Sequence, residues 1–195
     1  MRKLVLLTIG LLFCGTIQAQ ISKGDVQLGG SISWNNVDNG PTKISIFDVQ
    51  PNVGKFVSDR TSLGLIVGYN AVTRDVMVNN NIFELNDNRF EYGVYARFHK
   101  PIGEKFYFYL QPSVVLGTGE DQFDTTNTLD IELFAIRIIP GITYFLNEKW
   151  ALEMRFGNIL YRKEKASGAF NRDTDQFTLN MGLSNVGIGM SFYLK

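Results

Sequence analysis

The sequence predicts an all-β fold, an eight-stranded antiparallel up-and-down transmembrane β-barrel. Apolar and polar residues alternate with a period of two along almost the whole chain, and helical periodicity is absent. Short polar turns and long polar connections follow one another, as in membrane barrels built from strands. After residue 20 the longest uninterrupted apolar run is Phe106–Leu110, whereas a transmembrane helix needs about 20 apolar residues. A polytopic helical membrane protein is therefore excluded.

The first residues have the organisation of an export signal. Arg2 and Lys3 precede a short apolar stretch, and the small residue Ala19 offers a cleavage position. We expect residues 1–19 to be a signal peptide and residues 20–195 to form the barrel. Removing the two cations from 19 basic residues leaves 17 against 19 acidic ones, and the only cysteine is lost as well. The balance gives no basis for nucleic-acid binding, and a disulfide scaffold is excluded.

Eight segments carry the alternation, each with one apolar face. The expected strands are, in order, 25–34, 43–56, 61–73, 90–99, 106–119, 131–145, 150–160 and a final strand that ends at Leu194. Residues typical of their apolar faces are, in the same order, Trp34, Phe47, Leu65, Tyr92, Phe108, Ile136, Leu152 and Ile188. Most segments are long enough for a tilted crossing of about 9–11 residues. In the last segment the apolar residues change from odd-numbered to even-numbered positions, which predicts a bulge near Asn185.

The connections between these segments alternate in length. Tight turns are expected at 57–60, 100–105 and 146–149, and longer polar loops at 35–42, 74–89, 120–130 and 161–176. An even number of strands places both termini at the short-turn rim, which is periplasmic in an outer-membrane barrel. One turn region repeats, because Pro51–Leu63 is similar to Pro140–Leu152.

The face opposite the apolar one is polar and rich in glycine and tyrosine. Small residues on this face make room for large side chains inside a narrow barrel. Its charges balance, three carboxylates against three guanidinium groups: Asp48, Glu91, Glu153, Arg97, Arg137 and Arg155. Because charges that face a low-dielectric interior must be paired or hydrated, we expect an interior charge network. A soluble barrel would instead place the apolar face inside.

Aromatic residues gather near both predicted rims. The set near the tight turns is Phe56, Phe98, Phe106, Phe145, Trp150 and Phe192, and the set towards the other rim is Trp34, Tyr69 and Phe90. Two aromatic girdles that flank an apolar band are typical of a barrel embedded in a bilayer. We therefore expect the apolar face to contact lipid.

Three stretches resemble a known family. The opening Lys23–Ser31, the Pro-x-Val-Gly-x-Phe turn sequence at 51–56 and the closing Val186–Phe192 are similar to the small outer-membrane β-barrel domain family of Gram-negative bacteria. This family comprises the OmpX-like and OmpA-transmembrane-like barrels, often labelled porin family. The resemblance implies a location in the bacterial outer membrane and insertion by the outer-membrane assembly machinery. It carries over no functional residues.

Nothing in the sequence predicts an enzyme, a cofactor or a metal site. The only histidine, His99, lies beside a predicted periplasmic turn, and the mature chain has no cysteine. The polar loops do not match a calcium-binding loop. A basic group in the last predicted loop, Arg162, Lys163 and Lys165, offers a contact for anionic lipopolysaccharide, although a solvated loop explains it equally well.

Three functions remain open from the sequence. The first is a structural or surface-interaction barrel with a side-chain-filled interior and four extracellular loops, surrounded by outer-membrane lipid and lipopolysaccharide. The second is a narrow porin-like channel for small solutes, and the third is a soluble exported lipid-binding barrel. An eight-stranded barrel is just wide enough inside for side chains, which favours the first. The extracellular partner is not identified.

Overall fold

The structure, a computed structural model, describes residues 21–38, 40, 42–78, 81–122, 127–180 and 186–195. The predicted signal peptide and the predicted bulge at Asn185 lie outside them. In these ranges no helix is long and apolar enough to cross a membrane. The strands are β1 (Val26–Asp38), β2 (Thr42–Ser58), β3 (Thr61–Val78), β4 (Asn81–Pro101), β5 (Phe106–Gln122), β6 (Thr128–Phe145), β7 (Trp150–Phe156), β8 (Asn158–Gly168), β9 (Arg172–Asn180) and β10 (Val186–Leu194).

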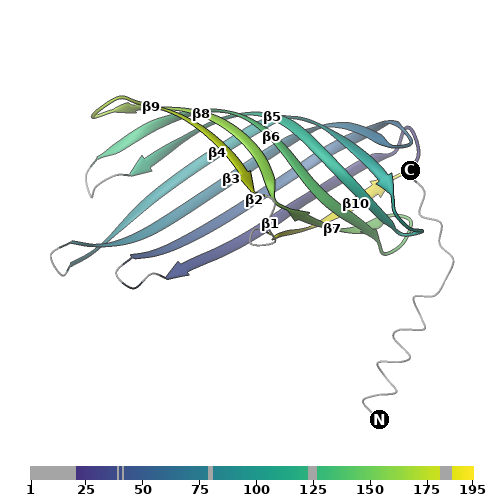
Figure 1. The fold of residues 1–195 in the computed structure, drawn as a ribbon, viewed down its shortest axis with the longest axis horizontal. Helices are drawn as coiled ribbons and strands as arrows, with labels where there is room; N and C mark the ends of the chain where they lie inside the picture. Colours follow the sequence, from purple (N-terminus) through teal and green to yellow (C-terminus); the bar gives the residue numbers. More distant parts are fainter. Residues whose placement is uncertain (1–20, 39, 41, 79–80, 123–126, 181–185) are drawn as a thin grey trace, which may run out of the picture.

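The strands form one antiparallel sheet that closes on itself (Figure 1). Among the described residues, the closed ring contains eight strands: β1 to β7 together with β10. Pairing of β5 with β6 completes one side of the ring, and pairing of β1 with β10 completes the other. The predicted eight-stranded antiparallel up-and-down barrel is therefore confirmed. Closure gives every ring strand two neighbours and leaves no free edge in that part.

The two ends of the barrel differ. At the short-turn end, β2–β3, β4–β5 and β6–β7 are joined by the predicted tight turns. Both described chain ends lie there too, because Val26 pairs with Leu194. At the opposite end, which we call the long-hairpin end, β3 with β4, β5 with β6 and β8 with β9 extend as long hairpins. Beyond Ile32, β1 pairs only with β2 in the described part of the chain, so the ring opens there.

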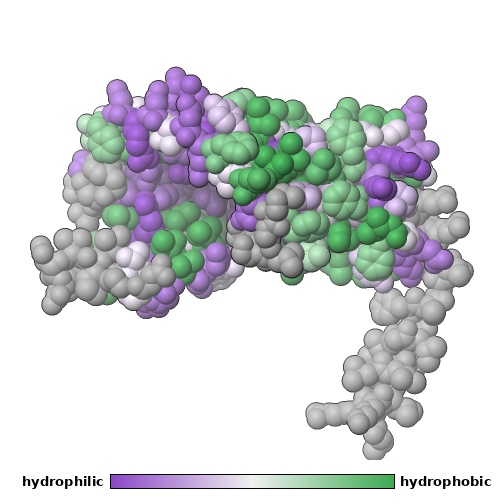
Figure 2. Space-filling model, in the orientation of Figure 1, coloured by the Kyte–Doolittle hydropathy of each residue, from purple (hydrophilic) through white to green (hydrophobic). Residues whose placement is uncertain are grey.

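The faces of the strands follow the predicted parity. Outward residues are apolar and exposed, and they form what we call the apolar belt, which includes Ile32, Leu65, Val94, Ile136 and Ile188. Figure 2 shows hydrophobic residues gathered over part of the molecule, with hydrophilic residues towards both ends. The inward residues at the same level are polar. This arrangement is opposite to that of a soluble lipid carrier, whose apolar residues face inwards.

The aromatic girdles need one correction. Phe98, Phe106 and Trp150 are exposed on the belt as predicted, but Phe56 and Phe145 are buried inside the barrel. Phe56 shares the parity of the inward residue Gln50, and Phe145 shares that of Arg137. The period of two therefore places both rings inside, although they lie close to the turns in sequence.

The predicted long loops also need correction, because much of their length is strand. The hairpins continue to Val78, Gln122 and Gly168, well past the ends of the predicted segments. Polar side chains on both faces suit a strand that lies outside the apolar belt, so the loss of an apolar face did not mean the loss of strand. One predicted strand is also broken, since Gly157, with φ of 70°, separates β7 from β8. Only glycine adopts this backbone conformation readily.

Candidate functional site

The barrel interior is the candidate site, and a buried ion pair occupies its centre. Arg97 on β4 and Glu153 on β7 face each other across the lumen, with 2.7 Å between Arg97 Nη1 and Glu153 Oε1. Their side chains are only 1% and 3% exposed. Alternation on two strands far apart in the sequence brings them together, and ring closure sets the distance between them.

Neutral side chains complete the bonding of this pair. Arg97 Nε donates to Gln111 Oε1 at 2.8 Å, while Gln27 Nε2 and Ser191 Oγ both donate to Glu153 Oε1 at 2.6 Å. The Arg97 guanidinium also lies over the Tyr109 ring, 4.5 Å from its centroid. A buried charge pair needs such extra hydrogen bonds because both ions have lost their water. Residues of β1, β4, β5, β7 and β10 thus meet in one layer that fills the lumen.

A second level of charges lies nearer the long-hairpin end. Arg137 on β6 and Glu91 on β4 are paired, with 2.6 Å between Nη2 and Oε1 and with 12% and 11% of their side chains exposed. Arg155 Nη1 donates to Gln50 Oε1 at 2.6 Å. The structure therefore brings four of the six predicted network residues into two ion pairs. Asp48 feels the charges of Arg155, Arg137 and Glu91, but none of the described ion pairs includes Asp48 or Arg155.

Glycines make room for the tyrosines of the interior. A Cβ at Gly141 would collide with the Tyr109 ring, and one at Gly64 would lie 2.6 Å from Tyr95 Cζ. A Cβ would also come too close to a backbone oxygen at both positions, Met154 O for Gly141 and Val53 O for Gly64. Real Cβ atoms do not approach other atoms so closely, so these two positions admit only glycine.

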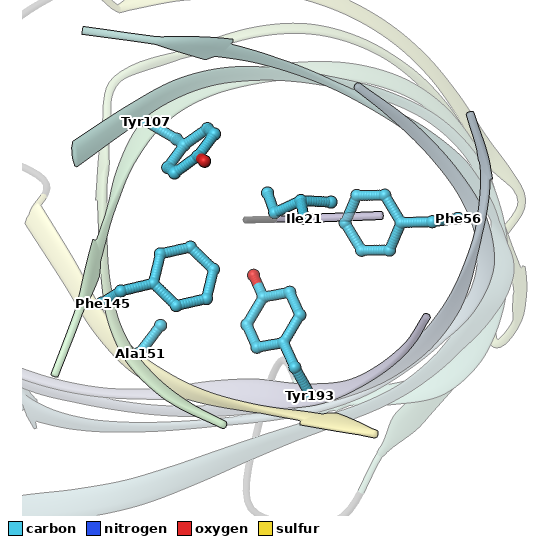
Figure 3. Packing of buried hydrophobic residues seen from close by; sticks show 6 residues of the cluster. All are labelled: Ile21, Phe56, Tyr107, Phe145, Ala151 and Tyr193. Atoms are coloured by element: carbon cyan, nitrogen blue, oxygen red, sulfur yellow. The ribbon is translucent and has the colours of Figure 1, made fainter. Parts of the chain in front are cut away.

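An aromatic cluster closes the short-turn end (Figure 3). The side chains of Phe56, Tyr107, Phe145 and Tyr193 converge there with Ile21, which precedes β1. The Phe145 and Tyr193 rings are 4.8 Å apart, and His99 lies 5.2 Å from Phe56. We call this cluster the aromatic plug. Its tyrosines were predicted to face inwards, but Ile21, Phe56 and Phe145 were missed, although the repeat places Phe56 and Phe145 at equivalent positions.

A further ionic cluster lies at the long-hairpin end, beyond the apolar belt. Arg74 Nη2 is 2.8 Å from Asp87 Oδ2 and 2.9 Å from Asp121 Oδ1. Arg172 reaches Asp121 at 3.3 Å and Glu164 at 3.7 Å. This hairpin cluster joins β3, β4 and β5 to the β8–β9 hairpin. Sequence reasoning missed it because these residues were assigned to loops, where no parity could place them.

The two aspartates that pair with Arg74, Asp87 and Asp121, have pKa shifts in opposite directions. Burial, together with the neighbouring Asp121 carboxyl group, raises the pKa of Asp87 above its usual value. Burial opposes the charged form of Asp121 as well, but hydrogen bonding to Asp87 and the charge of Arg74 outweigh it, so the pKa of Asp121 is lowered. The carboxylates titrate as a pair, with Asp87 taking up the first proton.

The predicted lipopolysaccharide contact is split between two faces. Lys163 and Lys165 point outwards on β8, whereas Arg162 points inwards beside the buried Leu160 and Glu164. The outward lysines stand opposite Asp175 and Asp173 of β9. The outer surface at this point therefore carries both signs of charge. In the described ranges no group of three metal-ligating side chains is close enough to hold a metal ion.

Comparison with known proteins identifies similar chains. A family model described as "Outer membrane protein beta-barrel domain" matches residues 5–192. A search of curated proteins found no match. Among solved structures, the N-terminal β-barrel domain of Pseudomonas aeruginosa OprF is similar at 11% identity and a TM-score of 0.49, over 88% of this chain and 98% of that one.

Two Neisserial structures are similar as well. Neisserial surface protein A (NspA) has 12% identity and a TM-score of 0.47, over 86% of this chain and 95% of its own. The translocator domain of the autotransporter NalP from Neisseria meningitidis has 13% identity and a TM-score of 0.45, over 98% of this chain and 67% of its own.

Proposed function

The chain belongs to the outer membrane protein β-barrel domain family, and on that premise we propose that it is a closed membrane anchor that displays β-hairpins at the cell surface. The observation that carries the proposal is the filled interior. The aromatic plug and the Arg97–Glu153 layer occupy the lumen at two successive levels. A narrow channel needs a continuous water-filled path, which these layers oppose.

In this proposal, the hairpins at the long-hairpin end are the part of the protein that is displayed at the cell surface. They extend past the apolar belt as paired strands, and the hairpin cluster joins several of them through ion pairs. Paired and cross-linked strands hold a fixed shape better than single loops, and a fixed shape lowers the entropic cost of binding. The proposal therefore assigns this end to the cell exterior and both termini to the periplasm.

The proposal includes no catalytic activity and no cofactor. His99, the only histidine, packs among Phe56, Tyr107 and Tyr109 within the closed end of the barrel. Neither ring nitrogen of His99 has a hydrogen-bond partner among the described residues, whereas a catalytic histidine is held by such a partner. We expect outer-membrane lipid and lipopolysaccharide to surround the belt, and the outer-membrane assembly machinery to insert the chain.

Surface labelling of cysteine variants tests the proposal. The mature chain has no cysteine, so Asn171→Cys in the β8–β9 hairpin and Glu148→Cys in the β6–β7 turn each add a single thiol. Both positions are exposed. On intact cells, a membrane-impermeant maleimide should label Asn171→Cys, and it should label Glu148→Cys only after the outer membrane is permeabilised. Labelling of Glu148→Cys alone on intact cells would mean that the opposite end is displayed.

A further inference from the structure

Arg162 is an interior arginine whose charge is neutralised by none of the described ion pairs, and unlike Arg155 it donates no hydrogen bond to a neutral side chain such as Gln50 in the described part of the chain. Arg162 points inwards on β8, and its cross-strand neighbours, Ala135 on β6 and Gln176 on β9, are both neutral. Its Nε atom is buried without a hydrogen-bond partner, and none of the ion pairs in the described part of the chain includes it. A guanidinium group in a confined interior normally has an anionic partner, because removing an unpaired charge from water is costly.

Two more arginines face the same region. Arg89 on β4 and Arg137 on β6 are the like charges that act most strongly on Arg162. The carboxylates in reach, Glu164 and Glu91, are already used. Arg89 lies 3.3 Å from one oxygen of Glu164, and Arg172 lies 3.7 Å from the other. Arg137 forms an ion pair with Glu91, with 2.6 Å between nitrogen and oxygen. Arg89, Arg137 and Arg162 therefore converge on these two carboxylates, and both carboxylates are paired with arginines other than Arg162.

We propose that Arg89, Arg137 and Arg162 bind a phosphate group inside the long-hairpin half of the barrel. Guanidinium groups match the oxygens of phosphate with paired hydrogen bonds. Phosphate also carries more oxygens and more negative charge than a carboxylate, so it can accept from several guanidinium groups that approach from different sides.

The site is reached from the long-hairpin half of the barrel, where the ring of described strands also opens beyond Ile32. The aromatic plug closes the short-turn end, whereas 20% of the Arg89 side chain and 12% of the Arg137 side chain are reached by solvent. Figure 2 shows the molecule hollowed at the long-hairpin end, with both hydrophilic and hydrophobic residues around the hollow. A free phosphate group or the phosphate of a lipid headgroup would enter from this side.

Thermal unfolding of the refolded barrel in zwitterionic detergent tests the proposal. Millimolar inorganic phosphate should raise the Tm of the wild type saturably, relative to chloride at the same ionic strength. Arg162→Gln should lose this response, and without phosphate it should be at least as stable as the wild type, because the substitution removes an uncompensated charge. Lys163→Gln is the matched control, since it loses the same charge from the outward face of the same strand.

The control separates binding from a general effect of the salt. Phosphate is excluded from protein surfaces and stabilises most proteins, but that effect would raise the Tm of all three proteins equally. An equal rise in wild type and Arg162→Gln, or no rise with either inorganic phosphate or the phosphatidic acid of the second arm, would overturn the proposal. If Arg162→Gln fails to refold, Arg162→Lys keeps the charge without the planar fork and should lose most of the response. An undiminished response in that variant would also overturn it.

A second arm identifies the source of the phosphate. Micelles doped with phosphatidic acid present the same group on a lipid, with undoped micelles as the reference. If the wild-type Tm rises only with the lipid, and the rise is lost in Arg162→Gln, the ligand is the phosphate of a membrane lipid. If the Tm rises only with inorganic phosphate, and the rise is again lost in Arg162→Gln, the ligand is a free solute. The readout is made in micelles, so it does not depend on which end faces the cell exterior.

Discussion

Arg97 contacts several of the side chains that fill the centre of the barrel. It is the largest fully buried residue among those described, and its guanidinium group contacts Glu153, Gln111 and the Tyr109 ring. Removing one partner of a buried pair leaves the other charge without compensation, which costs more than the pair itself contributes. The Arg137–Glu91 pair is partly exposed, and water screens it more effectively.

We therefore predict that Arg97→Ala destabilises the barrel by about 3–5 kcal/mol, and that Arg137→Ala costs less. Urea unfolding of refolded protein in detergent measures both. The double variant Arg97→Ala/Glu153→Ala is the control, and it should be less destabilised than the two single effects predict in sum, because no unpaired charge remains. Wild-type stability of Arg97→Ala would show that water replaces the guanidinium group without cost.

Adjacent residues on β6 should respond in opposite ways to polar substitution. Ile138 shares the parity of the exposed Ile136, and Ile139 shares the parity of Arg137, opposite the buried Gln111. Ile138→Arg should cost roughly 2–4 kcal/mol, the cost of arginine on a lipid face near the middle of the membrane. Ile139→Gln should be mild. Unfolding in lipid vesicles gives both values, and equal stability of wild type and Ile138→Arg would place Ile138 away from lipid.

The sequence could predict which side chains enter the lumen but not which of them pair. Parity alone places Arg97, Arg137 and Glu153 inside. The partner of each depends on ring closure, strand tilt and side-chain length, which no local pattern contains. Arg155 illustrates this, because it donates a hydrogen bond to Gln50 and forms none of the described ion pairs. Phe56 was misplaced for a different reason, because closeness to a turn was given more weight than parity.

At the scale of elements, the hairpins were the hardest part to predict. Hydrophobic alternation marks a strand only where one face is apolar, and β8 and β9 lie largely beyond the belt. Their pairing is continuous from Asn158↔Asn180 to Ala166↔Arg172. The break at Gly157 was missed because one glycine among many on the inward face gives no distinct signal.

The hairpin cluster predicts opposite pH responses for its two aspartates. The raised pKa of Asp87 means that its ionisation disfavours the folded state, so this cost is present at neutral pH and disappears below the ordinary aspartate pKa of about 3.9. The lowered pKa of Asp121 means that its ionisation favours folding, and that contribution is lost as the pH falls through its lowered pKa.

Asp87→Asn should therefore be at least as stable as the wild type at pH 7. As the pH falls below the raised pKa of Asp87, the stability of the wild type should increase relative to that of Asp87→Asn. Asp121→Asn should be destabilised at pH 7, and its deficit should shrink in acid. Thermal unfolding of the three proteins between pH 3 and pH 7 compares these trends. The same pH trend in both variants would contradict the assignment of the first proton to Asp87.

For the whole molecule, closure of the ring predicts resistance to detergent. β1 and β10 close the seam through seven residue pairs, and at that level each ring strand pairs its backbone groups with two neighbours. Refolded protein should stay folded in SDS at room temperature and should change its gel mobility only after boiling. Identical migration of boiled and unboiled refolded samples would contradict a closed ring.

Single-channel recording in planar bilayers tests directly whether the lumen of the barrel is filled. The aromatic plug and the Arg97–Glu153 layer place buried side chains in the lumen at two successive levels, and we infer that they leave no continuous water path. We predict no steady conductance from the wild-type barrel under conditions where a reconstituted porin conducts. Large, steady single-channel currents from pure refolded protein would contradict it and would favour the narrow channel.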